Sequence, residues 1–192
     1  MSDELFGVRN SVYLGAYQQA ISDALSVSAA SDAVRVERDF FMYRAFVEQG
    51  QYRVVMDEVT SDSAIPVQAV KQLATYLDGG RPQKDAAIAQ IKEWLTSTGS
   101  GDWMLLYIAG TLLMHEDEYK EALKYTHSHT NLDVMALVVQ LYIGMHRMDL
   151  ARKQFESMQQ AHTPYPYSHL NPHTPYPHTL ARKQFESMQQ AP

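Results

Sequence analysis

The segment AGTLLMHEDEYKEAL, residues 109–123, shows in one place a pattern that recurs along this chain of 192 residues. An apolar stretch ends in a short polar break at Asp117, an aromatic residue follows at Tyr119, and a small residue, Ala122, stands three positions further on. A tight turn between paired helices needs glycine or a short polar residue, and a small side chain lets the two helices approach closely. The segment therefore predicts a helix hairpin.

The same pattern occurs five times, and its small residues lie 35, 32, 35 and 29 residues apart. The mean spacing of about 33 is close to the tetratricopeptide period of about 34. It predicts an all-α fold, a tetratricopeptide-like right-handed α-solenoid of about five helix hairpins over residues 1–161. An ordinary helical bundle with chance spacing is the alternative. The break, aromatic or apolar residue and small residue are Gly15, Tyr17 and Ala20; Gly50, Tyr52 and Val55; a degenerate Pro82, Lys84 and Ala87; Asp117, Tyr119 and Ala122; and His146, Met148 and Ala151.

Helix punctuation agrees with this prediction. Pro66 suits the first turn of a helix that runs to about Leu77. The glycine-containing stretches at 78–82 and 98–101 have low helix propensity, so a helix is expected to end at each of them. Residues 105–113 place their apolar side chains on one broad helical face, as a buried first helix requires.

Composition excludes several classes of function. The net charge of −6 argues against binding to nucleic acid, which needs clustered Lys and Arg. The absence of cysteine removes disulfide scaffolds and thiol catalysis and fits a reducing compartment. No apolar run approaches the roughly 20 residues that span a bilayer, and the opening MSDE does not resemble a signal peptide. We therefore expect a soluble intracellular protein without direct membrane insertion.

No residue cluster carries catalytic chemistry. The acidic groups at 57–58 and 116–118 fall at helix ends or turns, where solvated charge is usual. His127 and His129 are two apart and would face different sides of a helix. Phosphate-binding loops, nucleophile elbows and dinucleotide fingerprints are missing from the sequence. We predict no enzyme, no cofactor and no metal site; the alternative, a metal-dependent hydrolase on a helical scaffold, needs convergent ligands that the sequence does not offer.

Stacked helix hairpins instead create a curved superhelix with an extended concave groove for a partner. Arg9 and Arg44 occupy equivalent repeat positions and would project into that groove. Alternatively, the two arginines only solvate the groove or pair with Glu37 and Asp39. The candidate groove residues are Arg9, Phe40, Arg44, Tyr107 and Gln140.

The C-terminal tail departs from the repeat pattern. LARKQFESMQQA at 150–161 recurs identically at 180–191, with a Pro- and His-rich linker over 162–179. Dense proline favours extended polyproline-II geometry, so we expect a poorly ordered connector. A polyproline ligand or a His-rich metal tract is the alternative. The duplicated segment, 180–192, is expected to dock on the end of the fifth hairpin or to compete with residues 150–161.

Several stretches together resemble the epsilon subunit of coatomer, most closely its plant and algal versions. The resemblance covers about residues 3–161, and its most specific part is the NxxYLGAYQ core at 10–18. The matching stretches are DELFGVRNSVYLGAYQQAI (3–21), VERD (36–39), YRAF (43–46), PVQAVKQLATYL (66–77), AGTLLMHEDEYKEALKYTHS (109–128) and MALVVQLYIGMHRMDLARKQFESMQQ (135–160).

The resemblance implies a non-catalytic scaffold subunit of the COPI vesicle coat. Such a subunit binds the C-terminal region of the coatomer alpha subunit through its solenoid. It would be cytoplasmic and peripheral on Golgi membranes and COPI vesicles, in Golgi-to-ER retrograde and intra-Golgi transport. The family continues into further helical repeats where this chain enters its linker, so weaker binding to the alpha subunit is expected. A truncated regulatory or nonfunctional isoform, or a generic tetratricopeptide adaptor, is the alternative.

One specific adaptor type is a chaperone-binding carboxylate clamp. Such a clamp needs Lys and Asn along the first helices to hold a C-terminal carboxylate by charge-assisted hydrogen bonds. The corresponding positions are Leu5, Arg9, Phe41, Ala69 and Leu73. With one charge among them, the sequence disfavours the clamp.

Overall fold

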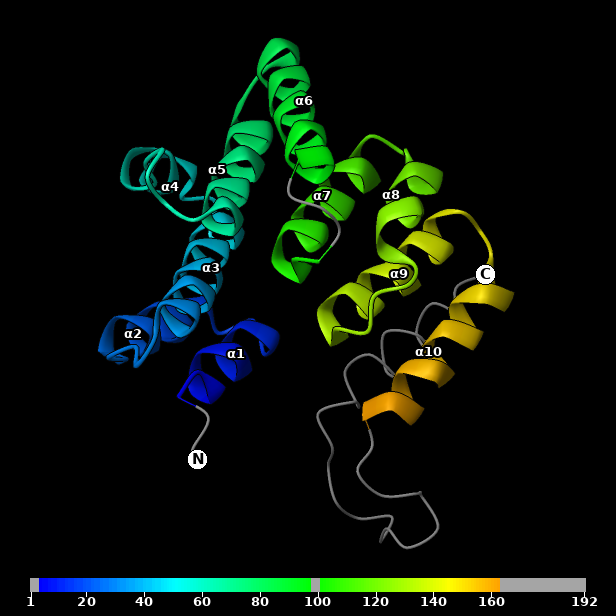
Figure 1. The fold of residues 1–192 in the computed structure, drawn as a ribbon, viewed down its shortest axis with the longest axis horizontal. Coiled ribbons are helices and arrows are strands. Elements are labelled where there is room, and N and C mark those ends of the chain that lie inside the picture. The colour runs from blue at the N-terminus through cyan, green and yellow to red at the C-terminus, as the bar shows by residue number, and fades with distance from the viewer. Residues whose placement is uncertain (1–3, 98–100, 163–192) are drawn as a thin grey trace, which may run out of the picture. The chain divides into compact units, whose positions relative to one another are not determined.

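The computed structural model describes residues 4–97 and 101–162, and over these ranges the regular structure is helical throughout. The expected linker and the duplicated segment lie outside the described residues, apart from His162 at the end of the last helix. The helices are α1 (Phe6–Tyr13), α2 (Tyr17–Ser26), α3 (Asp32–Glu48), α4 (Tyr52–Glu58), α5 (Ile65–Asp78), α6 (Arg81–Ser97), α7 (Trp103–His115), α8 (Tyr119–Thr126), α9 (Leu132–Gly144) and α10 (Met148–His162) (Figure 1).

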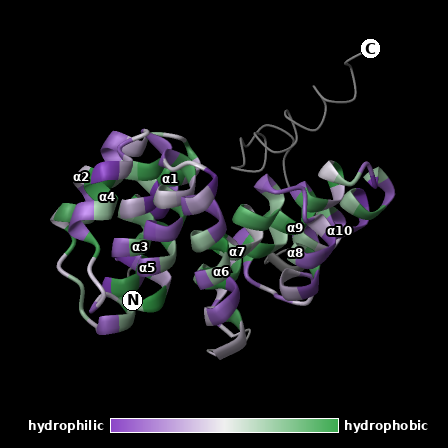
Figure 2. Cartoon of the chain, turned by 90° about the horizontal axis from the view of Figure 1, so that it is seen from above, coloured by the Kyte–Doolittle hydropathy of each residue, from purple (hydrophilic) through white to green (hydrophobic). Residues whose placement is uncertain are grey.

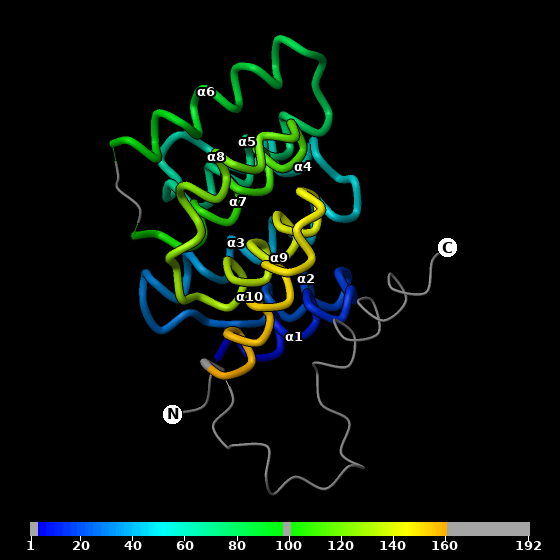
Figure 3. The backbone as a smooth tube through the Cα atoms, turned by 90° about the vertical axis from the view of Figure 1, so that its right-hand side faces the viewer, coloured from blue at the N-terminus to red at the C-terminus, as the bar shows by residue number. Residues whose placement is uncertain are grey.

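The helices alternate between two structural roles. The odd-numbered helices α1, α3, α5, α7 and α9 pack each on the next and form one row, which we call the first-helix row. Each of α2, α4, α6 and α8 packs against its own first helix and also against the first helix of the following hairpin. The trace in Figure 3 follows this alternation along the chain. The arrangement confirms the predicted all-α, tetratricopeptide-like solenoid.

Four hairpin turns share one backbone conformation. Their turn residues are left-handed: φ is 75° at Gly15, 72° at Gly50, 59° at Asp117 and 58° at His146. In each turn the N–H of this residue donates to the carbonyl three residues back, and the next N–H donates to the carbonyl five residues back, at 2.9–3.1 Å. These two bonds satisfy carbonyls that the end of a helix leaves free. All four breaks predicted from the non-degenerate repeats are therefore confirmed.

The third hairpin turns differently. Helix α5 ends at Asp78, Gly79 is extended with φ −90° and ψ 162°, and α6 begins at Arg81. This is the repeat whose sequence pattern is degenerate. Pro66 does lie in the first turn of α5, as predicted.

The small residues of the repeat lie where helices meet. Ala20, Val55, Ala122 and Ala151 have no exposed surface, and Ala87 has 1%. Their burial confirms the repeat register. A further close approach occurs between the first helices α7 and α9, because a Cβ added to Gly110 would meet Leu137 Cδ2 at 2.6 Å.

The core follows the first-helix row. Buried side chains run continuously from Leu5 on the N-terminal side to Val134, with a second cluster around Leu113 and Leu141. Helices α7 and α9 are the most continuously hydrophobic of the row (Figure 2). Phe40 packs edge-on against Trp103, with ring centroids 5.5 Å apart. This aromatic contact joins α3 to the start of α7, two places further along the row.

Candidate functional site

The five candidate groove residues all lie on first helices, but their exposure differs widely. Gln140 on α9 is exposed, whereas Arg9 on α1 and Tyr107 on α7 are half-buried. Phe40 has no exposed surface and Arg44 retains 9%. The structure therefore places Phe40 and Arg44 inside the protein and leaves the other three accessible to a partner.

Arg9 connects the first two hairpins. Its Nη1 lies 3.4 Å from Oε1 of Glu37 on α3, and both side chains are partly exposed. The pairing of Arg9 with Glu37, which the sequence analysis gave as an alternative, is thus present. Asp39, by contrast, pairs with Arg38 at 2.7 Å and not with Arg44.

Arg44 is a buried cation held among aromatic rings. Its Nη2 donates to the Tyr107 hydroxyl at 2.9 Å, and its guanidinium carbon lies 4.2 Å from the centroid of the same ring. It also lies 5.4 Å from the Phe40 ring centroid and 5.7 Å from that of Phe41. Aromatic faces attract a guanidinium, most strongly when water is excluded. The buried Phe40 ring therefore forms part of the aromatic surroundings of Arg44.

The counter-charge to Arg44 comes from the far end of the row. Asp133 Oδ1, in the first turn of α9, lies 3.8 Å from Arg44 Nη1. Asn131 precedes α9 and accepts the Asp133 N–H at 2.9 Å, so this helix start is capped and the carboxylate is fixed in place. Burial raises the pKa of Asp133, and the charge of Arg44 opposes that rise.

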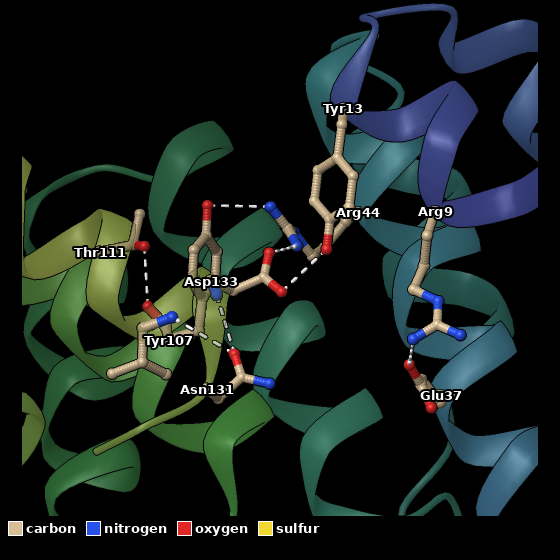
Figure 4. A network of polar contacts seen from close by, with 9 residues as sticks. Arg9, Tyr13, Glu37, Arg44, Tyr107, Thr111, Asn131 and Asp133 are labelled. Carbon is tan, nitrogen blue, oxygen red and sulfur yellow. Dashed lines mark hydrogen bonds and ion pairs between the residues drawn. The ribbon is translucent and has the colours of Figure 1, made fainter. Parts of the chain in front are cut away.

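Tyr13 completes the group from α1. Its hydroxyl donates to Asp133 Oδ2 at 2.9 Å, although the two residues are 120 positions apart (Figure 4). Burial and the negative charge of Asp133 raise the pKa of Tyr13 far above its usual value. Side chains of the first, second, fourth and fifth hairpins thus converge on one point: Tyr13, Arg44, Tyr107 and Asp133.

The sequence interpretation missed Tyr13 and Asp133. A signal for Asp133 exists, because it lies thirteen residues before the turn residue His146, as Glu37 lies thirteen before Gly50. Both acids pair with an arginine from an earlier hairpin. For Tyr13 we find no comparable signal in the sequence.

The acidic groups at the turns are occupied by contacts between hairpins. Glu116 accepts hydrogen bonds from Tyr76 at 2.7 Å and from Arg81 at 2.8 Å. Lys92 on α6 donates to Glu118 and Glu121 on the following hairpin. These contacts give the acids a role in joining α5 and α6 to the fourth hairpin.

Two kinds of feature are absent from the described residues. Within residues 4–97 and 101–162 there is no group of three or more His, Asp or Glu side chains arranged to hold a metal ion. Over the same ranges, no helix is both long and apolar enough to cross a membrane.

Comparison with known proteins gives the following matches. A family model described as the coatomer epsilon subunit matches residues 1–164. Coatomer subunit epsilon-1 of Oryza sativa subsp. japonica is 47% identical over 82% of this chain and 54% of its own length. Coatomer subunit epsilon-1 of Arabidopsis thaliana is 44% identical over the same shares. Among solved structures, MamA MSR-1 C2 matches with a TM-score of 0.43 at 18% identity, covering 81% of this chain and 91% of its own.

Proposed function

The chain belongs to the coatomer epsilon subunit family, and from that membership we propose that it is a non-catalytic scaffold subunit of the COPI vesicle coat. It spans about half the length of the curated relatives that it matches. The proposed partner is the C-terminal region of the coatomer alpha subunit, and through it the rest of the coat. In this role the protein would be cytoplasmic, peripheral on Golgi membranes and COPI vesicles, and active in Golgi-to-ER retrograde and intra-Golgi transport.

One observation carries the binding role: the first helices pack consecutively, so their side chains form one continuous face. Helical repeat proteins bind partners over such extended surfaces. Three accessible residues of this face come from three different hairpins: Arg9, Tyr107 and Gln140. A polypeptide that lies along the row could contact all three, and this supports their assignment as partner-binding residues.

The burial of Phe40 and Arg44 gives them a different proposed part in binding. Both support the ring of Tyr107, because Arg44 contacts it directly and Phe40 packs beside Arg44. They would act by fixing the position of the accessible Tyr107 side chain.

The test is co-purification of the full chain with the C-terminal region of the alpha subunit. The variant Gln140→Trp places a large side chain on the exposed side of α9, and we expect it to weaken binding at least tenfold. Arg53→Trp is the matched control, since Arg53 is also exposed but lies on the second helix α4. Failure of the unmodified chain to retain this region of the alpha subunit would overturn the proposal. Equal weakening by both variants would instead reject the first-helix row as the binding face.

A further inference from the structure

The two ends of the first-helix row are joined by side chains and not by packed helices. Helix α1 packs on α2 and α3, and α9 packs on α7 and α8, but neither α1 nor α3 packs along α9. Polar contacts nevertheless reach α9 from both helices, because Tyr13 and Arg44 each contact Asp133 (Figure 4). We infer that these three residues form a releasable clasp that holds the first and fifth hairpins together and opens when the Tyr13–Asp133 hydrogen bond breaks.

The contacts within the clasp indicate that it is not a permanent joint. The Arg44–Asp133 pair is long at 3.8 Å, and Arg44 Nη1 is buried without a hydrogen-bond partner. Taking both charges out of water is costly, and a pair at this distance offsets only part of that cost. The hydrogen bond from Tyr13, at 2.9 Å, is shorter than the Arg44–Asp133 pair, so its loss should shift the balance toward an open form.

Access to the clasp comes through Tyr13. About half of this side chain, 51%, is exposed, whereas the side chains of Arg44 and Asp133 are each only 10% exposed. The Tyr13 ring packs edge-on against Phe41 with centroids 6.2 Å apart. We expect the ring to turn outward when the clasp opens. In the open form Arg44 and Asp133, now accessible to water, separate with their own helices.

This inference goes beyond the proposed function, because opening and closing of the clasp requires no partner. The chain contains no cysteine, so two introduced cysteines can carry spin labels without background labelling. Leu14→Cys and Gln140→Cys are suitable positions, since both are exposed, one directly after α1 and the other on α9. Pulsed electron–electron double resonance then measures the distance between the two spin labels, and so between the first and fifth hairpins, in the full chain.

The deciding substitution is Tyr13→Phe, which keeps the ring and removes the hydroxyl. We expect the single short distance of the unsubstituted protein to be joined by a longer one. Tyr119→Phe is the matched control, because the Tyr119 hydroxyl also binds a carboxylate, Asp117 Oδ1 at 2.7 Å, but within one turn. It should leave the distribution unchanged. An unaltered distribution in Tyr13→Phe, or an equal change in Tyr119→Phe, rejects the clasp.

Amide hydrogen exchange provides the second readout. A clasp predicts that Tyr13→Phe accelerates exchange in α1 and in the first turns of α9, while α5 and α6 keep their protection. Uniform acceleration of exchange over all helices would mean that Tyr13 contributes only to global stability. That result would overturn the inference.

Discussion

The ring of Tyr119 lies directly against the backbone of Gly144. A Cβ added to that glycine would meet Tyr119 Cε1 at 2.5 Å. Tyr119 is the aromatic residue of the fourth repeat and Gly144 belongs to the first helix of the fifth, so the ring fills the wedge between successive hairpins.

The first prediction concerns this contact. Gly144→Ala should lower the free energy of unfolding by about 1–3 kcal/mol, because the added methyl group overpacks a site that the ring already fills. Gly101→Ala is the control, since nothing lies within 4 Å of its Cβ position. Urea denaturation followed by circular dichroism measures both variants. Equal stability of the two would contradict the close packing of Tyr119 on Gly144.

The second prediction concerns the left-handed turns. His146→Gly should stabilise the protein by about 1 kcal/mol, because glycine adopts a φ of 58° without the steric cost that histidine has there. Gly50→Ala should destabilise it by a similar amount. Space is not the reason for the latter, since no atom lies within 4 Å of the Gly50 Cβ position. Thermal melts measure the change in melting temperature of both variants. A change in the same direction for both would refute the conformational argument.

The third prediction concerns the buried charge pair. Arg44→Met should cost about 3–5 kcal/mol of stability, because Asp133 then stays buried without its counter-charge. Adding Asp133→Leu to that variant should restore most of the loss, since no buried charge remains. A double-mutant cycle measured by chemical denaturation supplies the coupling energy. Additive losses in the double variant would show that the two side chains do not interact.

The fourth prediction concerns pH. Burial, and then the hydrogen bond to Glu116, raise the pKa of Tyr76 to about 12. The hydrogen bonds from Tyr76 and Arg81 lower the pKa of Glu116. A raised tyrosine pKa contributes stability below the unfolded value of about 10 that is lost as pH rises through 12. A lowered carboxyl pKa contributes stability above about 4.3 that is lost on acidification.

The Tyr76–Glu116 pair should therefore stabilise the fold between about pH 4.3 and 10. Alkaline titration followed at 295 nm should show Tyr76 ionising later than the exposed tyrosines. Tyr76→Phe should remove one late-ionising group and leave the rest of the curve in place. Ionisation of Tyr76 together with the main group of tyrosines would contradict the bond to Glu116.

Much of the fold could be predicted because the repeat is a local property. A left-handed turn, an aromatic or apolar residue and a small residue lie within six positions. Their steric requirements are visible in the sequence at Gly15 and Gly50 as at Asp117 and His146. These local rules placed the hairpin boundaries correctly. The degenerate sequence of the third repeat coincides with its different turn.

The candidate site was predicted less completely, because its contacts depend on how successive hairpins rotate. Repeat position placed Arg44 on the first-helix row, but not the Asp133 carboxylate beside it from a hairpin three repeats later. The same limit applies to Phe40, whose burial depends on Trp103 across the row. Small changes of angle between successive hairpins accumulate along the chain. The local repeat pattern therefore does not predict which side chains of distant hairpins meet.

The contact between Tyr13 and Asp133 has a consequence for how the protein melts. In an open array of repeats, each repeat contacts only its neighbours, so the first and last repeats can unfold independently of each other. While the Tyr13–Asp133 bond joins the first hairpin to the fifth, neither of these hairpins can loosen without loosening the other. Thermal denaturation of the first and fifth hairpins should consequently be a single cooperative event.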